Sequence, residues 1–217
     1  MIEIVPELDN EYSVFMYIPN FLDTHYYNTL KKELDDTSDW KNGISSHGNQ
    51  IQRSQKWYQK DNYPFCKSWN KQYDRWQSHN YTDILNKIQD IINNRIVEEL
   101  PKLKNIQIPE YNSLLINYYK NGNNLISAHK DNHLSFGMYP TISNLSIGES
   151  RTFVLERTHV DKLNRNKNEN HLNKQYILED NSLFVMAGAS QRYYCHFIPR
   201  EIDKKKSRYS LTYREYI

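Results

Sequence analysis

Short runs of β-forming residues, separated by turn-forming stretches, dominate the C-terminal half of the chain. The runs fall at residues 114–119, 152–155, 183–186, 193–198 and 208–216, and stretches rich in Gly, Asn or Ser lie at 121–124 and 187–190. Segments of this kind are typical of strands joined by tight turns, and no segment with helical spacing separates them. The pattern therefore predicts an all-β core within residues 111–217.

Two segments of the N-terminal half have the spacing of helices that cover a sheet. Asp23 is a suitable N-cap for the first helix and Thr82 for the second, whose pattern Pro101 ends. The first helix carries apolar side chains at Tyr26, Tyr27, Leu30 and Leu34. The second carries a longer stripe at Ile84, Leu85, Ile88, Ile91, Ile92 and Val97. We expect a mainly β fold in which these helices brace a sheet from one side, preceded by a short strand within residues 16–22.

Length and composition set wide limits. The 217 residues fit a single domain, residues 1–217, with helices and a surface lid in 1–110 and the β core in 111–217. A net charge of +2 permits a nucleic-acid partner without requiring one. The start lacks a basic leader, no segment resembles a membrane span, and two distant cysteines suggest a reducing compartment. We expect an intracellular protein of the cytoplasm or nucleus, and the Asn- and Lys-rich composition suits an AT-rich genome such as that of a virus.

His129 and Asp131 are two residues apart, so they would project from the same face of a strand. His196 lies further on, in an apolar, strand-like run. Separately, these residues favour structural roles, because His-x-Asp occurs by chance and a histidine in such a run is usually a satisfied core residue. Together, two imidazoles and one carboxylate form the ligand set that leaves part of a ferrous ion open.

Arg208 and Arg214 also share a strand face, together with Ser210 and Thr212 between them. Two arginines in one interior would repel unless an anion lies between them, and an α-keto dicarboxylate would satisfy both. The alternative is that they lie on the solvated face of an end strand. Asn117 and Tyr119 share a face in the same way on an earlier strand, and Gly122 permits the turn after it.

The order of these residues resembles the AlkB-type iron(II)- and 2-oxoglutarate-dependent dioxygenases. The family pattern is Asn-x-Tyr-x-x-Gly, Ile-x-x-His-x-Asp, Ser-x-Gly-x-x-Arg-x-Phe, His and Arg-x-Asn-x-Thr-Phe-Arg. This chain has Asn117-x-Tyr119-x-x-Gly122, Ile126-x-x-His129-x-Asp131, Ser146-x-Gly148-x-x-Arg151-x-Phe153, His196 and Arg208-x-Ser210-x-Thr212-Tyr213-Arg214. The agreement extends in order over about 100 residues.

The resemblance implies a double-stranded β-helix, or jelly roll, that uses iron(II), 2-oxoglutarate and dioxygen. Iron would be held by His129, Asp131 and His196. The cosubstrate would be bound by Asn117, Tyr119, Arg208, Ser210, Thr212 and Arg214, with Arg208 on its distal carboxylate and Arg214 on the carboxylate nearer the metal. Hydroxylation of an alkyl carbon on a base nitrogen would then release formaldehyde and the repaired base, beside succinate and carbon dioxide.

Substrate contacts are expected in two places. Residues 40–80 mix basic and aromatic side chains, which can hold phosphates and stack on bases, and Arg53-x-Gln55-x-x-Tyr58 is similar to the family's nucleotide-recognition lid. The alternative is that these rings pack under a long loop. The expected substrate-binding residues are Arg53, Gln55, Trp57, Tyr58, Asn132 and His133.

Two departures from the family pattern bear on function. Ser210 stands where the family has Asn, which predicts modestly weaker cosubstrate binding. Asn132 and His133 follow the His-x-Asp pair where DNA-repair members often carry acidic residues. We therefore expect a monomeric oxidative demethylase of alkylated DNA or RNA, and keep two alternatives: the same chemistry on a protein or lipid, and a non-catalytic nucleic-acid-binding relative.

Overall fold

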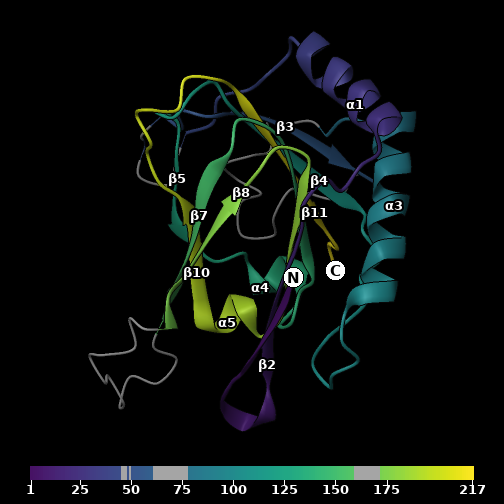
Figure 1. Ribbon diagram of the computed structural model, residues 1–217, viewed down its shortest axis with the longest axis vertical. Coiled ribbons are helices and arrows are strands. Elements are labelled where there is room, and N and C mark those ends of the chain that lie inside the picture. The colour runs from purple at the N-terminus through teal and green to yellow at the C-terminus, as the bar shows by residue number, and fades with distance from the viewer. Residues whose placement is uncertain (45–47, 49, 61–77, 159–171) are drawn as a thin grey trace.

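The computed structural model describes residues 1–44, 48, 50–60, 78–158 and 172–217. Two antiparallel sheets lie face to face, and two long helices cover the outer face of the larger one (Figure 1). In spatial order the larger sheet contains β1 (Ile2–Pro6), β2 (Tyr12–Ile18), β9 (Ser182–Gly188), β6 (Ile142–Gly148), β11 (Arg208–Arg214), β4 (Ser113–Tyr119) and β3 (Ser54–Gln59). The smaller sheet contains β5 (Ile126–His129), β10 (Tyr194–Ile198), β7 (Arg151–Arg157) and β8 (Lys174–Leu178).

Four α-helices and one 3-10 turn complete the described elements: α1 (Thr24–Asp36), α3 (Asp83–Glu99), α4 (His133–Phe136), α5 (Ser190–Tyr193) and η1 (Leu8–Asn10). None of the helices in the described part of the chain is long and apolar enough to cross a membrane. This arrangement confirms a mainly β fold braced by helices on one side.

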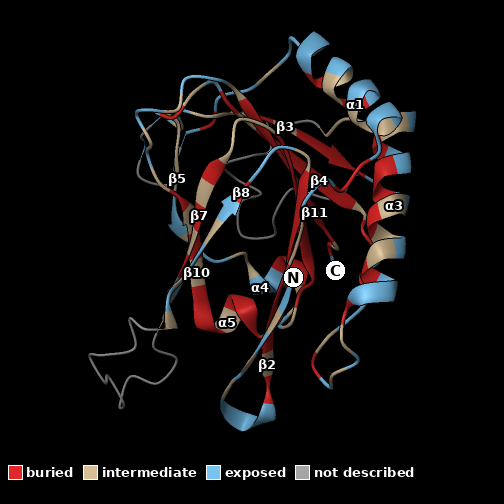
Figure 2. Ribbon diagram, in the orientation of Figure 1, coloured by how far each residue is buried: buried red, intermediate tan, exposed pale blue. Residues whose placement is uncertain are grey.

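The side chains of β11 alternate between two buried regions, one on each face of the larger sheet. Tyr209, Leu211 and Tyr213 pack into the apolar layer between the larger sheet and the helices. The alternating residues, from Arg208 to Arg214, face the space between the two sheets, and every residue of β11 is buried (Figure 2). Because successive side chains point to opposite faces, one strand supplies both a hydrophobic core and a polar cavity.

The predicted helix caps are present. The Asp23 side chain accepts a hydrogen bond from the backbone nitrogen of Tyr26, and the Thr82 hydroxyl accepts one from that of Leu85. Within α3 one predicted core residue is wrong: Val97 is 58% exposed, whereas Ile96 is fully buried. Ile96 continues the stripe at i+4 from Ile92, and the next residue turns about 100° away from it.

Residues 54–59 differ most from expectation. We expected an irregular surface segment, but they form β3, an edge strand that pairs with β4 and places Gln55 opposite Asn117. Polar residues occupy inward positions of this strand, as Gln55 and Gln59 are both buried, so hydrophobic alternation does not reveal it. The rest of the expected lid within residues 61–77 and most of the predicted loop, residues 159–171, lie outside the described residues, and so does Cys66.

Candidate active site

His129, Asp131 and His196 meet between the two sheets near the end of β5. His129 ends β5 and is the register partner of His196 on β10, and their ring centroids are 4.2 Å apart. Asp131 lies just beyond the strand, in the segment that leads to α4, with Oδ1 3.8 Å from His129 Nε2. One ligand atom from each of the three residues lies within 4.8 Å of the others. The structure therefore brings together the predicted ligand set.

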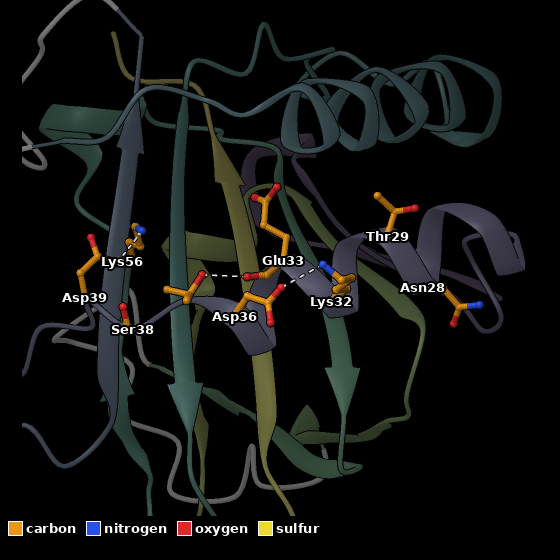
Figure 3. A pocket seen from close by; sticks show the side chains of 9 residues that line it. Asn28, Thr29, Lys32, Glu33, Asp36, Ser38, Asp39 and Lys56 are labelled. Atoms are coloured by element: carbon orange, nitrogen blue, oxygen red, sulfur yellow. Dashed lines mark hydrogen bonds and ion pairs between the residues drawn. The ribbon is translucent and has the colours of Figure 1, made fainter.

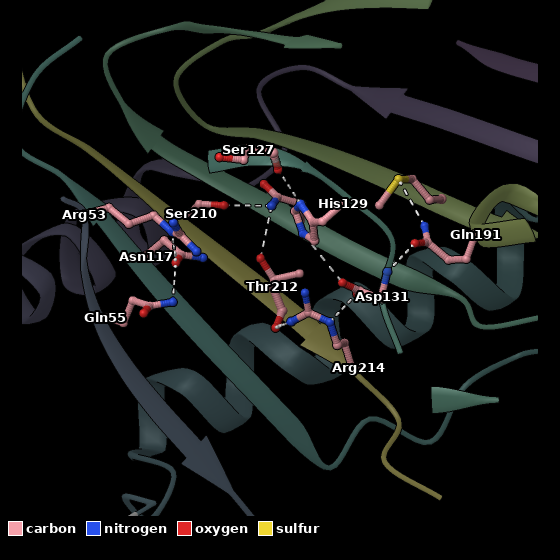
Figure 4. Close-up of polar contacts among 12 residues, drawn as sticks. Arg53, Gln55, Asn117, Ser127, His129, Asp131, Gln191, Ser210, Thr212 and Arg214 are labelled. Carbon is pink, nitrogen blue, oxygen red and sulfur yellow. Dashed lines mark hydrogen bonds and ion pairs between the residues drawn. The ribbon is translucent and has the colours of Figure 1, made fainter. Parts of the chain in front are cut away.

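Neighbouring groups fix the orientation of Asp131 and His129 (Figure 4). The Asp131 carboxylate accepts a hydrogen bond from Arg214 Nε at 2.6 Å, and the Asp131 backbone nitrogen donates to Gln191 Oε1 at 2.9 Å. His129 Nδ1 lies 2.8 Å from the Ser127 carbonyl oxygen, which leaves Nε2 directed at Asp131. Outer contacts of this kind hold a ligand's ring and tautomer in place, so the donor set fits an iron(II) ion.

The electrostatics keep all three residues in their metal-binding forms. Burial lowers the pKa of His129, and it lowers the pKa of His196 to about 3, so both rings are neutral at pH 7. Burial alone would raise the pKa of Asp131, but the charge and hydrogen bond of Arg214, together with the neighbouring His196 and His129, outweigh it and hold this pKa well below the ordinary value. Metal ligands must be deprotonated, and these residues already are.

A cavity of about 420 Å³ connects the three ligands with predicted cosubstrate and substrate residues. Its walls come from β3, β4, β5, β6, β7, β9, β10 and β11 and include the segment between β5 and α4. Among the predicted residues, those that line it are Arg53, Gln55, Asn117, Tyr119, His129, Asp131, Asn132, His196, Ser210, Thr212 and Arg214. This size suits a small cosubstrate together with part of a second molecule.

Arg208 lies beyond Ser210 on the same face of β11 and is 1% exposed. Its Nη2 donates to Ser146 Oγ at 2.8 Å, and its guanidinium lies 5.3 Å from the centre of the Tyr119 ring. Among the described residues, Nε and Nη1 have no hydrogen-bond partner, and no carboxylate forms an ion pair with Arg208. Burial lowers the pKa of Arg208 to about 10, so a charged and incompletely paired group remains at pH 7. Such a group fits an anionic ligand.

Arg151 shows how a structural arginine differs. It is buried to the same extent, yet its Nε donates to Glu201 at 2.7 Å and its Nη2 to the carbonyl oxygen of Asn124 at 2.9 Å. Both guanidinium groups lie near the Tyr119 ring, Arg151 at 5.7 Å and Arg208 at 5.3 Å from its centre. Arg208 thus lacks the carboxylate partner that Arg151 has.

Asn117 joins the cosubstrate region to β3. Its Oδ1 accepts hydrogen bonds from Arg53 Nε at 2.8 Å and from Gln55 Nε2 at 3.0 Å. Because both partners are donors, the amide orientation is fixed, and Nδ2 is left to donate to a ligand. Arg53 and Gln55 are therefore anchored at the cavity wall.

Three other predicted substrate residues do not line the cavity. Trp57 is buried and donates from its indole nitrogen to Gln59 Oε1 at 3.2 Å. Tyr58, 4% exposed, points to the opposite face of β3 and packs in the core beneath the helices. His133 is exposed on α4, which Asn132 caps by accepting from the Leu134 nitrogen. Trp57 and Tyr58 are therefore packed among protein groups and do not line the cavity.

Three residues near the site were not singled out for these roles by the sequence. Gln191 holds the Asp131 backbone, Ser146 contacts Arg208, and Asn144 donates to Ser210 Oγ and Thr212 Oγ1. For β6 a signal existed, since Asn144 and Ser146 alternate with Leu145 and Ile147. The sequence contains no such signal for Gln191, because the role of this residue depends on α5 lying next to Asp131.

A larger hollow of about 730 Å³ lies on the outer surface, between α1 and the outward face of β3 (Figure 3). Two ion pairs lie along it, Lys56 with Asp39 at 2.7 Å and Lys32 with Asp36 at 3.1 Å. Lys56 and Gln55 point to opposite faces of β3, so this hollow is separated from the three metal ligands by the larger sheet.

Residues 14–214 match the family described as the 2OG-Fe(II) oxygenase superfamily, and the chain belongs to it. The family's description names iron(II) and 2-oxoglutarate, for which the buried site supplies the ligand set and an incompletely paired arginine. Family membership thus implies iron(II) as the metal of this site and 2-oxoglutarate and dioxygen as its cosubstrates.

Curated relatives confirm the AlkB-type resemblance. The chain is 32% identical to human alpha-ketoglutarate-dependent dioxygenase alkB homolog 3 over 105 residues, which cover 48% of this chain and 36% of the human protein. It is 29% identical to DNA oxidative demethylase ALKBH2 of Arabidopsis thaliana, over 48% of this chain and 37% of that protein. The chain thus matches little more than a third of the length of these relatives.

Solved structures agree on the fold. OsALKBH1 matches with a TM-score of 0.60 at 14% identity, over 94% of this chain and 96% of that one. A prolyl hydroxylase from Trichoplax adhaerens, in complex with a peptide fragment of hypoxia inducible factor, matches with the same TM-score at 13% identity, over 94% and 83%. These proteins share the jelly-roll architecture, which does not itself choose a substrate.

Proposed function

We propose that the protein is an iron(II)- and 2-oxoglutarate-dependent dioxygenase that removes alkyl groups from bases in DNA or RNA. The observation that carries the proposal is one cavity in which the three metal ligands lie beside the anchored Arg53 and Gln55, with the incompletely paired Arg208 next to its wall. The sequence matches to alkB homolog 3 and to a DNA oxidative demethylase support a base as the substrate. We propose that residues 1–217 act as one unit, as an intracellular monomer.

Each part of the cavity has a defined task. Iron(II) and 2-oxoglutarate, when bound, use dioxygen to hydroxylate a carbon–hydrogen bond, with succinate and carbon dioxide as products. His129, Asp131 and His196 hold the metal on one side and leave the rest open to ligands. Arg208 binds the distal carboxylate of the cosubstrate, while Asn117 donates from its amide.

Arg214 has two tasks in this proposal. Its Nε is committed to Asp131, so it keeps that ligand anionic and correctly turned. Its terminal nitrogens would bind the carboxylate of the cosubstrate nearer the metal. The guanidinium also lies 5.4 Å from the Phe136 ring centre, which limits its movement.

The substrate enters from the side of β3 and β5. A base turned out of its stack is small enough for the remaining space, and Arg53 and Gln55 offer hydrogen bonds to its edge. Asn132, at the start of α4, lines the same cavity. After hydroxylation of the alkyl carbon, its bond to the base nitrogen breaks, which releases formaldehyde and the unmodified base.

The test is a screen of oligonucleotides that carry 1-methyladenine or 3-methylcytosine, as single- and double-stranded DNA and RNA. The protein with iron(II), 2-oxoglutarate and dioxygen should release formaldehyde from at least one of them, and Asp131→Ala should release none. If no methylated oligonucleotide loses its methyl group while 2-oxoglutarate is still consumed, the substrate is of another class, such as a protein or lipid.

A further inference from the structure

Asn144 links two hydroxyl groups on the cavity wall. It lies on β6 opposite Thr212, with Nδ2 2.7 Å from Ser210 Oγ and 3.1 Å from Thr212 Oγ1. All three residues line the cavity, and the dashed lines from Ser210 and Thr212 in Figure 4 mark these contacts. Arg208 precedes Ser210 by two residues and Arg214 follows Thr212 by two, so both arginines lie on the same face of β11 as the two hydroxyl groups. The Asn144 amide thus lies midway between the two arginines.

The contact gives both hydroxyls a defined direction. A primary amide nitrogen has two hydrogens, and here one serves Ser210 and the other Thr212. A hydroxyl that accepts in this way keeps its own hydrogen, and within the described part of the chain neither hydroxyl donates to a protein group. If the Asn144 amide were turned the other way, with its oxygen toward Ser210 and Thr212, both hydroxyl groups would donate to that oxygen. They would then present only lone pairs to the ligand. An anion between Arg208 and Arg214 therefore favours the orientation found here.

We propose that Asn144 is a positioning residue that makes Ser210 and Thr212 hydrogen-bond donors to 2-oxoglutarate. This inference rests on the proposed function, in which the cosubstrate lies between Arg208 and Arg214. It also accounts for the serine at 210, where the AlkB-type pattern has asparagine: the amide group comes from β6 instead of β11. The weaker cosubstrate binding expected from Ser210 alone is thereby offset.

The test measures the Kd of 2-oxoglutarate by calorimetry, with Mn²⁺ in place of iron so that no turnover occurs. Asn144→Ala should weaken binding about tenfold or more, since hydrogen bonds to a charged ligand lose their orientation. Asn144→Ser should weaken it similarly. Adding Ser210→Asn to Asn144→Ser should restore most of the affinity, because the amide and the hydroxyl have then exchanged strands.

Gln89→Ala provides a matched control. Gln89 is a buried amide on α3 that donates to the Tyr111 carbonyl oxygen at 2.9 Å, in the helix-facing layer. Its loss should lower the free energy of unfolding and leave the 2-oxoglutarate Kd unchanged.

Two results would overturn the role of Asn144: an Asn144→Ala protein that binds 2-oxoglutarate as the wild type does, or an exchanged pair no better than Asn144→Ser alone. Wild-type protein that binds no 2-oxoglutarate would instead reject the proposed function, and this inference with it.

Discussion

Replacement of Arg208 by Met should stabilise the ligand-free protein and weaken cosubstrate binding. The pKa of this arginine falls from 12.5 to about 10 on burial. At about 1.4 kcal/mol per pKa unit, its charge costs the folded state about 3 kcal/mol at pH 7, where it is protonated both folded and unfolded. Since the unfolded chain binds the proton more tightly, this cost fades as the pH rises above 10. Met fills a similar volume without charge, so the free energy of unfolding should rise by up to about 3 kcal/mol.

The same substitution removes the partner of the distal carboxylate. We expect the binding of 2-oxoglutarate to weaken by about 2 to 5 kcal/mol, which raises its Kd about thirtyfold or more. Urea denaturation measures the first effect and calorimetry with Mn²⁺ the second.

Arg151→Met is the matched control, because Arg151 is equally buried but paired with Glu201. Its loss should destabilise the protein by about 3 to 5 kcal/mol, since Glu201 is left without its cationic partner and the Asn124 carbonyl oxygen loses a donor. If Arg208→Met is destabilised as much as Arg151→Met, or binds 2-oxoglutarate normally, Arg208 is a structural residue and does not bind the cosubstrate.

Three further results are expected. His129→Ala and His196→Ala should each purify folded but without stoichiometric iron, as metal analysis would show; full iron content in either would remove that residue from the ligand set. Gln191→Leu should weaken iron binding by about 10- to 100-fold by freeing the Asp131 backbone, and a metal titration that matches the wild type would refute this. The metal-free protein should lose stability as the pH falls below about 6.5, because the lowered pKa of His196 lets the unfolded chain bind protons first; pH-independent urea midpoints between 7 and 5 would contradict this.

The sequence predicted those parts of the molecule that depend on local periodicity. Asp23 and Thr82 cap their helices because capping is a local interaction, and the alternation of β11 placed Arg208 and Arg214 on one face. Motif order then identified the family. The β3 strand was missed because polar Gln55 occupies an inward position, which only the neighbouring Asn117 makes favourable.

Contacts between distant segments could not be read from the sequence in the same way. Asn144 touches Ser210 across 66 positions, and Gln191 reaches Asp131 across 60. Tyr58 is the last residue of the lid motif, yet the parity of β3 turns its ring into the helix-facing core. These outcomes depend on register between strands, which a single sequence specifies only through the complete fold.

A crystal structure with Mn²⁺ and 2-oxoglutarate would show directly where the metal and the cosubstrate bind. We expect the metal bound by His129, Asp131 and His196, with the distal carboxylate of 2-oxoglutarate on Arg208. A metal held elsewhere, or a cosubstrate that leaves Arg208 without an anionic partner, would contradict this expectation.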